Sequence, residues 1–172
     1  KFFIASADGH VQEPRDFFRP RIPAEYHERL PGLVIDAKGG QFQKTEGFRA
    51  AKLEWVQPFE GHEQLRNRSG LTPEERLTDL ALDGTDAEIL FPNKGLVVWA
   101  TKDAHFSHLM CKAWNEWAWE TFAPFNDRLA PTACIAPASL DEALAEIQRV
   151  AALGFKGRCL PCNPVCRPPD AA

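Results

Sequence analysis

The sequence predicts an α/β fold built on a parallel sheet. Three observations carry this prediction: short apolar runs, helical periodicity in the segments between them, and turn residues at most boundaries. Strands that alternate with helices form crossover units, and crossover units align their strands in parallel. The chain has 172 residues, which is enough for one domain with a sizeable core and too few for two ordinary ones. We therefore expect a single domain over residues 1–172.

Four segments have the composition of strands in such a sheet. The first, residues 2–7, is apolar and ends in the polar tip Asp8-Gly9-His10. Later apolar runs occupy residues 87–92, 131–136 and 155–160. Short apolar runs next to glycine or proline are typical of buried strands.

The helices between these strands carry start and stop signals. Residues 72–84 begin with Thr-Pro-Glu-Glu and end in glycine, which predicts a capping box, a proline in the first turn and a glycine stop. Ser139 and Glu142 predict a second capping box for a helix that ends at Gly154. A longer helix over about residues 103–122 has apolar residues at three- and four-residue steps, and we interpret its tryptophans as core packing.

An excursion separates the first strand from the helix at residues 72–84. Pro23 suits the start of a short helix that runs towards Leu30. Residues 33–36 and 42–45 flank a glycine turn and predict a hairpin. Residues 46–70 show no clean period, so we expect the hairpin and loop excursion to cover about residues 31–70.

Composition excludes several classes of function. Twenty Lys+Arg against 24 Asp+Glu give a net charge of −4, which offers no electrostatic reason to bind nucleic acid or an anionic membrane. No apolar run is long enough to cross a bilayer, and no secretory signal opens the sequence. Five cysteines is an odd number, and Cys111 and Cys134 lie in apolar segments. We therefore expect a reducing, cytoplasmic environment.

Asp8 and His10 are the strongest candidates for chemistry. They stand two residues apart at the end of a strand, so their side chains share a face with Cα atoms about 6.6 Å apart. Carboxylate oxygen and imidazole nitrogen are both ordinary zinc ligands. The alternative is an Asp and a His that cap the neighbouring turn. Glu13 is a further ligand, a group that orients His10, or a plain loop glutamate before Pro14.

Residues 6–14, Ser-Ala-Asp-Gly-His-Val-Gln-Glu-Pro, resemble the opening signature of the amidohydrolase-related (amidohydrolase 2) family. The similarity is to its aminocarboxymuconate-semialdehyde decarboxylase-like branch. Residues 72–92, 114–129 and 151–163 resemble the family's second strand with its preceding helix, its next helix, and its fourth strand. The hairpin also has a counterpart in some members, so the resemblance covers most of the chain.

The resemblance implies a partial (β/α)8 TIM barrel, about its first four strands, with a β-hairpin excursion after strand 1. It implies a metal-dependent hydrolase or non-oxidative decarboxylase acting on a small carboxylated or cyclic substrate, with a divalent metal, usually zinc, as cofactor. Asp8 and His10 carry over as first-strand ligands, and the family's further ligands come from its second half. The four other histidines do not lie at predicted strand ends, where they could replace those ligands: His27, His62, His105 and His108.

Residues that follow the second and fourth strands are expected to line a substrate pocket: Phe91, Asn93, Pro161 and Asn163. A small-molecule substrate is the expected partner, and a homo-oligomer the expected state. The rival interpretation is a non-catalytic truncated relative, in which the half-barrel serves as a binding or oligomerising module. Half a barrel has two strand edges and an uncovered inner face, on which we expect Ile89 or Leu90 and Ile135, and both features promote self-association.

Three cysteines follow the fourth strand: Cys159, Cys162 and Cys166. Three thiolates without a fourth ligand are not a typical metal site. We expect instead a truncated or locally altered end, or a sequence that records part of a longer chain.

Overall fold

The structure, a computed structural model, describes residues 2–14, 16–52 and 72–162. The excursion consists of β2 (Gly32–Ile35), β3 (Gln41–Lys44), β4 (Ala51–Lys52) and the 3-10 helices η1 (Arg19–Arg21) and η2 (Ala24–Arg29). The remaining elements are β1 (Ala5–His10), α2 (Pro73–Asp83), β5 (Ala87–Phe91), η3 (Lys94–Val97), α3 (Ala104–Phe122), η4 (Ala123–Phe125), β6 (Leu129–Cys134), α4 (Leu140–Leu153) and β7 (Gly157–Cys159).

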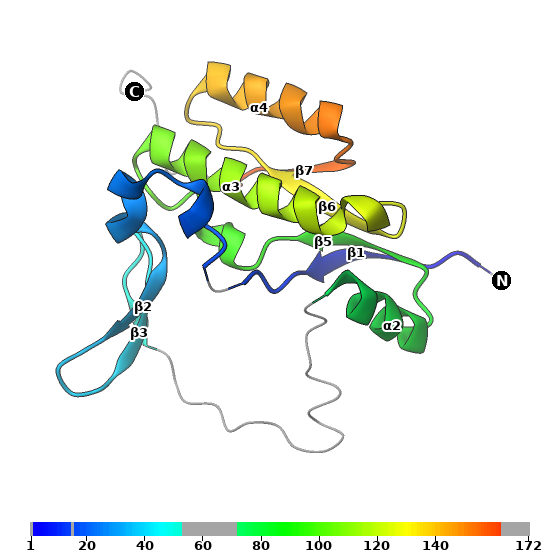
Figure 1. Ribbon diagram of the computed structural model, residues 1–172, viewed down its shortest axis with the longest axis horizontal. Helices are drawn as coiled ribbons and strands as arrows, with labels where there is room; N and C mark the ends of the chain where they lie inside the picture. The colour runs from blue at the N-terminus through cyan, green and yellow to red at the C-terminus, as the bar shows by residue number, and fades with distance from the viewer. Residues whose placement is uncertain (1, 15, 53–71, 163–172) are drawn as a thin grey trace.

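The main sheet has four parallel strands in the order β1-β5-β6-β7, with a helix in each connection. The spatial order of these strands is their order along the chain, as in a barrel that is wound one βα unit at a time. Helix α3 lies along the sheet with α4 beyond it, and α2 lies near β1 (Figure 1). The predicted α/β class with a parallel sheet is confirmed.

Local signals place the helices as predicted. The Thr72 side chain accepts from the Glu75 amide and the Glu75 carboxylate accepts from the Thr72 amide, at 3.2 Å each. Gly84 ends α2 with φ of +73°. At Ser139 only the first half of the predicted box forms, and the Glu142 carboxylate meets Nδ1 of His105 on α3 at 2.9 Å. The second cap therefore also connects α4 to α3.

The first strand begins later than predicted. β1 covers Ala5–His10, so it includes the polar tip, whereas Phe2, Phe3 and Ile4 are 91%, 74% and 53% exposed. The prediction of a buried strand over residues 2–7 is wrong in its start and in its burial, because within β1 itself Gly9 is the one buried residue. The backbone carbonyl of Ile4 accepts from the amides of Asp86 and Ala87, so regular pairing with β5 starts only at the next residue.

Helix α3 supplies much of the core. Trp114 is fully buried and Trp117 nearly so, which confirms their assignment to core packing. On β5, Leu90 is buried whereas Ile89 is 40% exposed, because neighbouring strand residues point to opposite faces. The prediction that Ile135 is exposed is wrong: it is fully buried, and its carbonyl accepts from Nε1 of Trp99 at 2.8 Å. Among the described residues, no helix combines the length and apolar character needed to cross a membrane.

The predicted hairpin is confirmed as the antiparallel pair β2–β3, which β4 extends to three strands. It projects from the end of the molecule opposite the N-terminus (Figure 1). Its base is tied to the body by Arg29, which donates to both carboxylate oxygens of Glu46 at 2.8 Å and to Asp103 at 2.9 Å. Glu46 also accepts from the Thr101 hydroxyl at 2.5 Å.

Acidification is expected to weaken this anchor. The hydrogen bond from Arg29 holds the pKa of Glu46 below its ordinary value, and bonds from the Phe106 amide and from Arg29 do the same for Asp103. A carboxylate whose folded pKa is depressed stabilises the fold above its unfolded pKa, and that contribution is lost as pH falls through the folded pKa. We expect the free energy of unfolding in urea to fall below about pH 4. The Arg29–Glu46 ion pair is partly exposed, so it contributes about 1 kcal/mol or less to the free energy of unfolding.

The matched variant is Glu46→Gln, which keeps the shape and removes the charge. It should be less stable than the parent chain at pH 7 and should lose less stability on acidification. Parallel pH profiles for the two proteins would contradict a stabilising role for the Arg29–Glu46 pair.

Candidate functional site

Asp8 and His10 lie at the C-terminal end of β1 with their side chains facing each other. Oδ1 of Asp8 is 3.8 Å from Nε2 of His10. Their side chains are 90% and 43% exposed, respectively, so both are open to solvent. The two side chains lie close together at the strand end, as the two-residue spacing predicts, and the binding of one ion between them stays a prediction.

The His10 ring is oriented by a hydrogen bond at Nδ1, the nitrogen that does not face Asp8. Nδ1 lies 2.7 Å from the backbone carbonyl oxygen of Pro92. A carbonyl oxygen can only accept, so Nδ1 carries a proton, and in the neutral form of the ring the unprotonated nitrogen is Nε2, which faces Asp8. A backbone carbonyl on the non-ligating nitrogen is the usual support of a metal-binding histidine.

The spacing of the two donor atoms suits a small divalent ion. Zinc bonds of about 2.0–2.2 Å at a tetrahedral angle place two ligand atoms about 3.4 Å apart. The observed 3.8 Å exceeds this by a few tenths of an ångström, which rotation of the exposed Asp8 side chain can close. In the described ranges, however, no group of three or more His, Cys, Asp or Glu side chains is placed to hold a metal. The described chain therefore offers a pair of donors that fits part of a metal site.

The strand end is shaped by a β-bulge and a buried ion pair. The register of β1 against β5 shifts between Ser6 and Gly9. A Cβ on Gly9 would lie 2.0 Å from Oε1 of Glu88, so a larger residue there would displace the Glu88 side chain. Arg76 on α2 donates to Glu88 at 2.7 Å and to the backbone carbonyl of His10 at 2.9 Å. The backbone that carries His10 is thus fixed from α2.

Glu13 is neither an exposed loop residue nor a direct partner of His10. It is 2% exposed, and its carboxylate accepts from the backbone amides of Asn93, Lys94 and Gly95 at 2.8–3.0 Å. It also accepts from Nε1 of Trp114 at 2.8 Å. The two oxygens of this carboxylate accept from four donors. Glu13 therefore holds the loop after β5 and is not placed to bind a metal.

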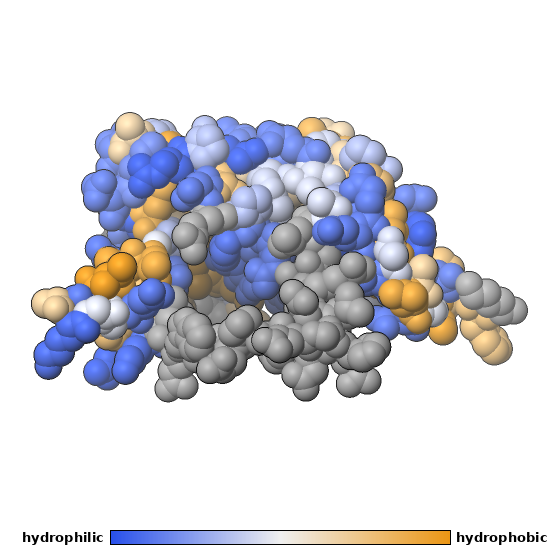
Figure 2. Space-filling model, turned by 60° about the horizontal axis from the view of Figure 1, so that its bottom comes forward, coloured by the Kyte–Doolittle hydropathy of each residue, from blue (hydrophilic) through white to orange (hydrophobic). Residues whose placement is uncertain are grey.

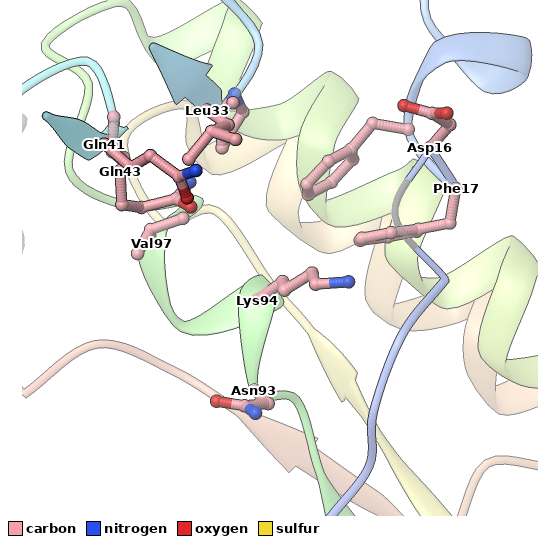
Figure 3. Close-up of a pocket in the computed structure, with 12 residues that line it drawn as sticks. Asp16, Phe17, Leu33, Gln41, Gln43, Asn93, Lys94 and Val97 are labelled. Carbon is pink, nitrogen blue, oxygen red and sulfur yellow. The ribbon is translucent and has the colours of Figure 1, made fainter. Parts of the chain in front are cut away.

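A cavity of about 600 Å³ lies between the hairpin, the segment after Glu13 and η3 (Figure 3). Its lining residues are Asp16, Phe17, Phe18, Pro31, Gly32, Leu33, Gln41, Gln43, Thr45, Asn93, Lys94 and Val97. Asn93 is the predicted pocket residue found among them. Phe91 instead places its ring 6.1 Å from the His10 ring, and Pro161 follows β7 at the far edge of the sheet. Asn163 lies outside the described residues.

Several cavity residues were missed from the sequence. Gln41 and Gln43 stand at alternate positions of β3, so they share one face; that spacing was visible in the hairpin pattern. Lys94 and Phe17 come from separate segments, and both line the cavity (Figure 3). No local sequence pattern predicts that Lys94 and Phe17 line the same cavity.

Within residues 2–14, 16–52 and 72–162, the other histidines and cysteines form no metal-holding group with Asp8 and His10. His27 contacts the carbonyl of Ile22 at 2.9 Å, and His105 contacts Glu142. Burial raises the pKa of the Cys111 and Cys134 thiols, which therefore stay protonated at neutral pH. Cys159 is partly buried, and burial raises its pKa as well. His62 and Cys166 fall outside the described residues.

No family model and no curated protein matches this sequence. Solved structures do match its fold. An amidohydrolase from Mycobacterium avium subsp. paratuberculosis K-10 has a TM-score of 0.72 at 16% identity, over 93% of this chain and 49% of that chain. The 2,6-dihydroxybenzoate decarboxylase from Rhizobium has a TM-score of 0.51 at 20% identity, over 91% and 37%. A 2,6-dihydroxybenzoate decarboxylase complexed with 2,6-dihydroxybenzoate has a TM-score of 0.50 at 20% identity, over 91% of this chain and 37% of that chain.

The chain folds as part of a (β/α)8 barrel. At these identities the likeness is one of fold, and it places β1, β5, β6 and β7 as neighbouring parallel strands of such a barrel. The chain spans about half the length of the amidohydrolase, and less of the decarboxylase. Both proteins with this fold are named for enzymatic activities.

Proposed function

We propose that this chain carries the first-strand ligands of a metal-dependent hydrolase or non-oxidative decarboxylase of the amidohydrolase superfamily. The observation that carries the proposal is the bond from Nδ1 of His10 to the Pro92 carbonyl, which leaves Nε2 facing Asp8. The fold likeness to an amidohydrolase and a decarboxylase supports it, as does the resemblance of residues 6–14 to the opening signature of that family.

The proposed cofactor is a divalent metal, with zinc as the expected ion. When bound, such an ion activates a water molecule or holds a substrate carboxylate. Within this chain, His10 would offer Nε2 and Asp8 a carboxylate oxygen, whose negative charge would offset part of the ion's charge. The hydrogen bond to Pro92 keeps the His10 proton on Nδ1, so the ligating nitrogen need not lose a proton.

The proposed substrate is a small carboxylated or cyclic molecule, and the cavity beside η3 is its proposed binding place. Lys94 lines this cavity, and its ammonium group donates to the Glu13 backbone carbonyl, which leaves two N–H donors that would attract a carboxylate. Phe17 and Leu33 give apolar contact for a ring, and the amides of Gln41 and Gln43 give hydrogen-bonding groups. A cytoplasmic location belongs to the same proposal, supported by four free thiols among the described cysteines.

Metal binding tests the proposal directly. Three or four protein ligands are the norm for zinc, so the 172-residue chain should bind Zn²⁺ or Mn²⁺ weakly. His10→Ala and Asp8→Ala should each remove most of that binding in calorimetric titration. His105→Ala is the matched control, because His105 is also exposed and paired with a carboxylate, and it should bind like the parent chain. In a polypeptide that contains a whole barrel, the same two variants should lose metal and activity together.

A tight, stoichiometric ion that survives His10→Ala would contradict the proposal and would direct attention to the cysteines near Cys159. The rival function, a non-catalytic binding or oligomerising module, is favoured by one observation: the described residues bring together only two suitable donors at the site. The rival predicts that Asp8→Ala and His10→Ala leave metal binding unchanged.

A further inference from the structure

We infer that Glu13 is the positioning residue of the candidate metal site, acting on His10 through the Pro92–Asn93 peptide group. This inference rests on the proposed function in one respect, the role of His10 as a ligand. His10 and Glu13 are three residues apart in sequence, and the peptide group that connects them lies about 80 residues further along the chain.

The Pro92–Asn93 peptide group is bonded on both sides. Its N–H donates to Oε1 of Glu13 at 3.0 Å, and its carbonyl oxygen accepts from Nδ1 of His10 at 2.7 Å. A peptide group is planar, so fixing the N–H direction fixes the carbonyl direction. Glu13 therefore sets where the His10 proton donor must point.

The carboxylate also affects the strength of the second bond. An anion that accepts from an N–H polarises the peptide group and makes its carbonyl oxygen a better acceptor. A better acceptor on Nδ1–H makes Nε2 a better electron-pair donor. The arrangement is a carboxylate–histidine pair with one peptide group inserted between its members.

The loop that follows β5 is held firmly in this conformation. Three successive amides, those of Asn93, Lys94 and Gly95, converge on the one buried carboxylate. A Cβ on Gly95 would lie 2.5 Å from Cβ of Pro92 and 2.6 Å from Cδ1 of Trp114. The Lys94 ammonium group contacts the Glu13 backbone carbonyl, which places a compensating charge beside the buried anion.

The same residues form part of the cavity. Asn93 and Lys94 line it, and their backbone amides are the ones that Glu13 holds. Through one buried carboxylate, the orientation of His10 and this wall of the cavity are fixed together.

The test is the tautomer of His10, read by long-range ¹H–¹⁵N NMR on the metal-free 172-residue chain above the pH at which the ring is protonated. The parent chain should show the Nδ1–H tautomer and a hydrogen-bond coupling from Nδ1 to the Pro92 carbonyl carbon. Glu13→Gln should show a mixture of tautomers and a weaker coupling. Glu146→Gln is the matched control, because Glu146 is also a buried carboxylate, bonded to Asn115 and Arg149, and it should keep the parental tautomer.

Affinity for Zn²⁺ gives a second readout, expected to fall about 10–100-fold in Glu13→Gln and to stay unchanged in Glu146→Gln. An Nε2–H tautomer in the parent chain would overturn the inference even if Glu13→Gln failed to fold. A single Nδ1–H tautomer and parental zinc affinity in folded Glu13→Gln would also overturn it. If the tautomer shifts in Glu13→Gln but zinc does not bind the parent chain, the positioning role stands and the proposed function fails.

Discussion

Replacing Arg76 with alanine is expected to destabilise the fold by about 3–5 kcal/mol. Arg76 and Glu88 form an ion pair of 2.7 Å whose side chains are only 13% and 9% exposed. Without the guanidinium, the Glu88 carboxylate stays buried with its charge unpaired beneath Gly9. The variant also loses the bond from Arg76 to the backbone carbonyl of His10, so the end of β1 is loosened. Urea unfolding followed by circular dichroism measures the loss.

The control is the double variant Arg76→Met, Glu88→Met, which removes both charges and keeps most of the side-chain volume. It should recover much of the stability lost in Arg76→Ala, because well-packed apolar residues often replace a buried ion pair at little cost. A loss below about 0.5 kcal/mol in Arg76→Ala, the size of a neutral surface substitution, would mean that the pair is not buried in solution.

Self-association is the second large effect that we expect. Among the described strands, β1 and β7 are the two edges of the main sheet, and unpaired edges promote pairing with another chain. Exposed apolar side chains accompany them: Phe2, Phe3 and Ile4 before β1, Ile89 on β5, Leu160 after β7, and Leu33, Val34 and Ile35 on the hairpin. Figure 2 shows hydrophobic surface at both ends of one face, over the hairpin and near the N-terminus. Sedimentation velocity at micromolar concentration should therefore show dimers or larger species.

Two lysine substitutions distinguish association through the sheet from association through any exposed apolar residue. Ile89→Lys introduces a charge on the sheet face at a residue that is 40% exposed, and it should shift the population towards monomer. Leu144→Lys changes a residue of α4 that is 49% exposed, and it should leave the distribution unchanged. A parent chain that sediments as a monomer and melts cooperatively would rule out this prediction and would favour an open sheet that is stable alone.

The sequence by itself determined the features that local physics controls. The capping box at Thr72 and the stop at Gly84 place α2 to the residue, because both act within one turn of the backbone. The hairpin follows from its glycine turn. The pairing of Asp8 with His10 follows from the two-residue period of a strand. These statements need no knowledge of what packs against the segment.

Only the tertiary structure decided the surroundings of those residues. Glu13 meets Trp114 across 101 residues of chain and Lys94 across 81, so no local pattern could choose among its possible roles. The start of β1 at Ala5 depends on its pairing with β5, and the burial of Ile135 depends on the elements that pack over it; neither can be read from the local sequence. The tautomer of His10 was likewise set by a distant carbonyl, that of Pro92. Local geometry aligns two donors, but long-range packing determines which nitrogen is left to bind.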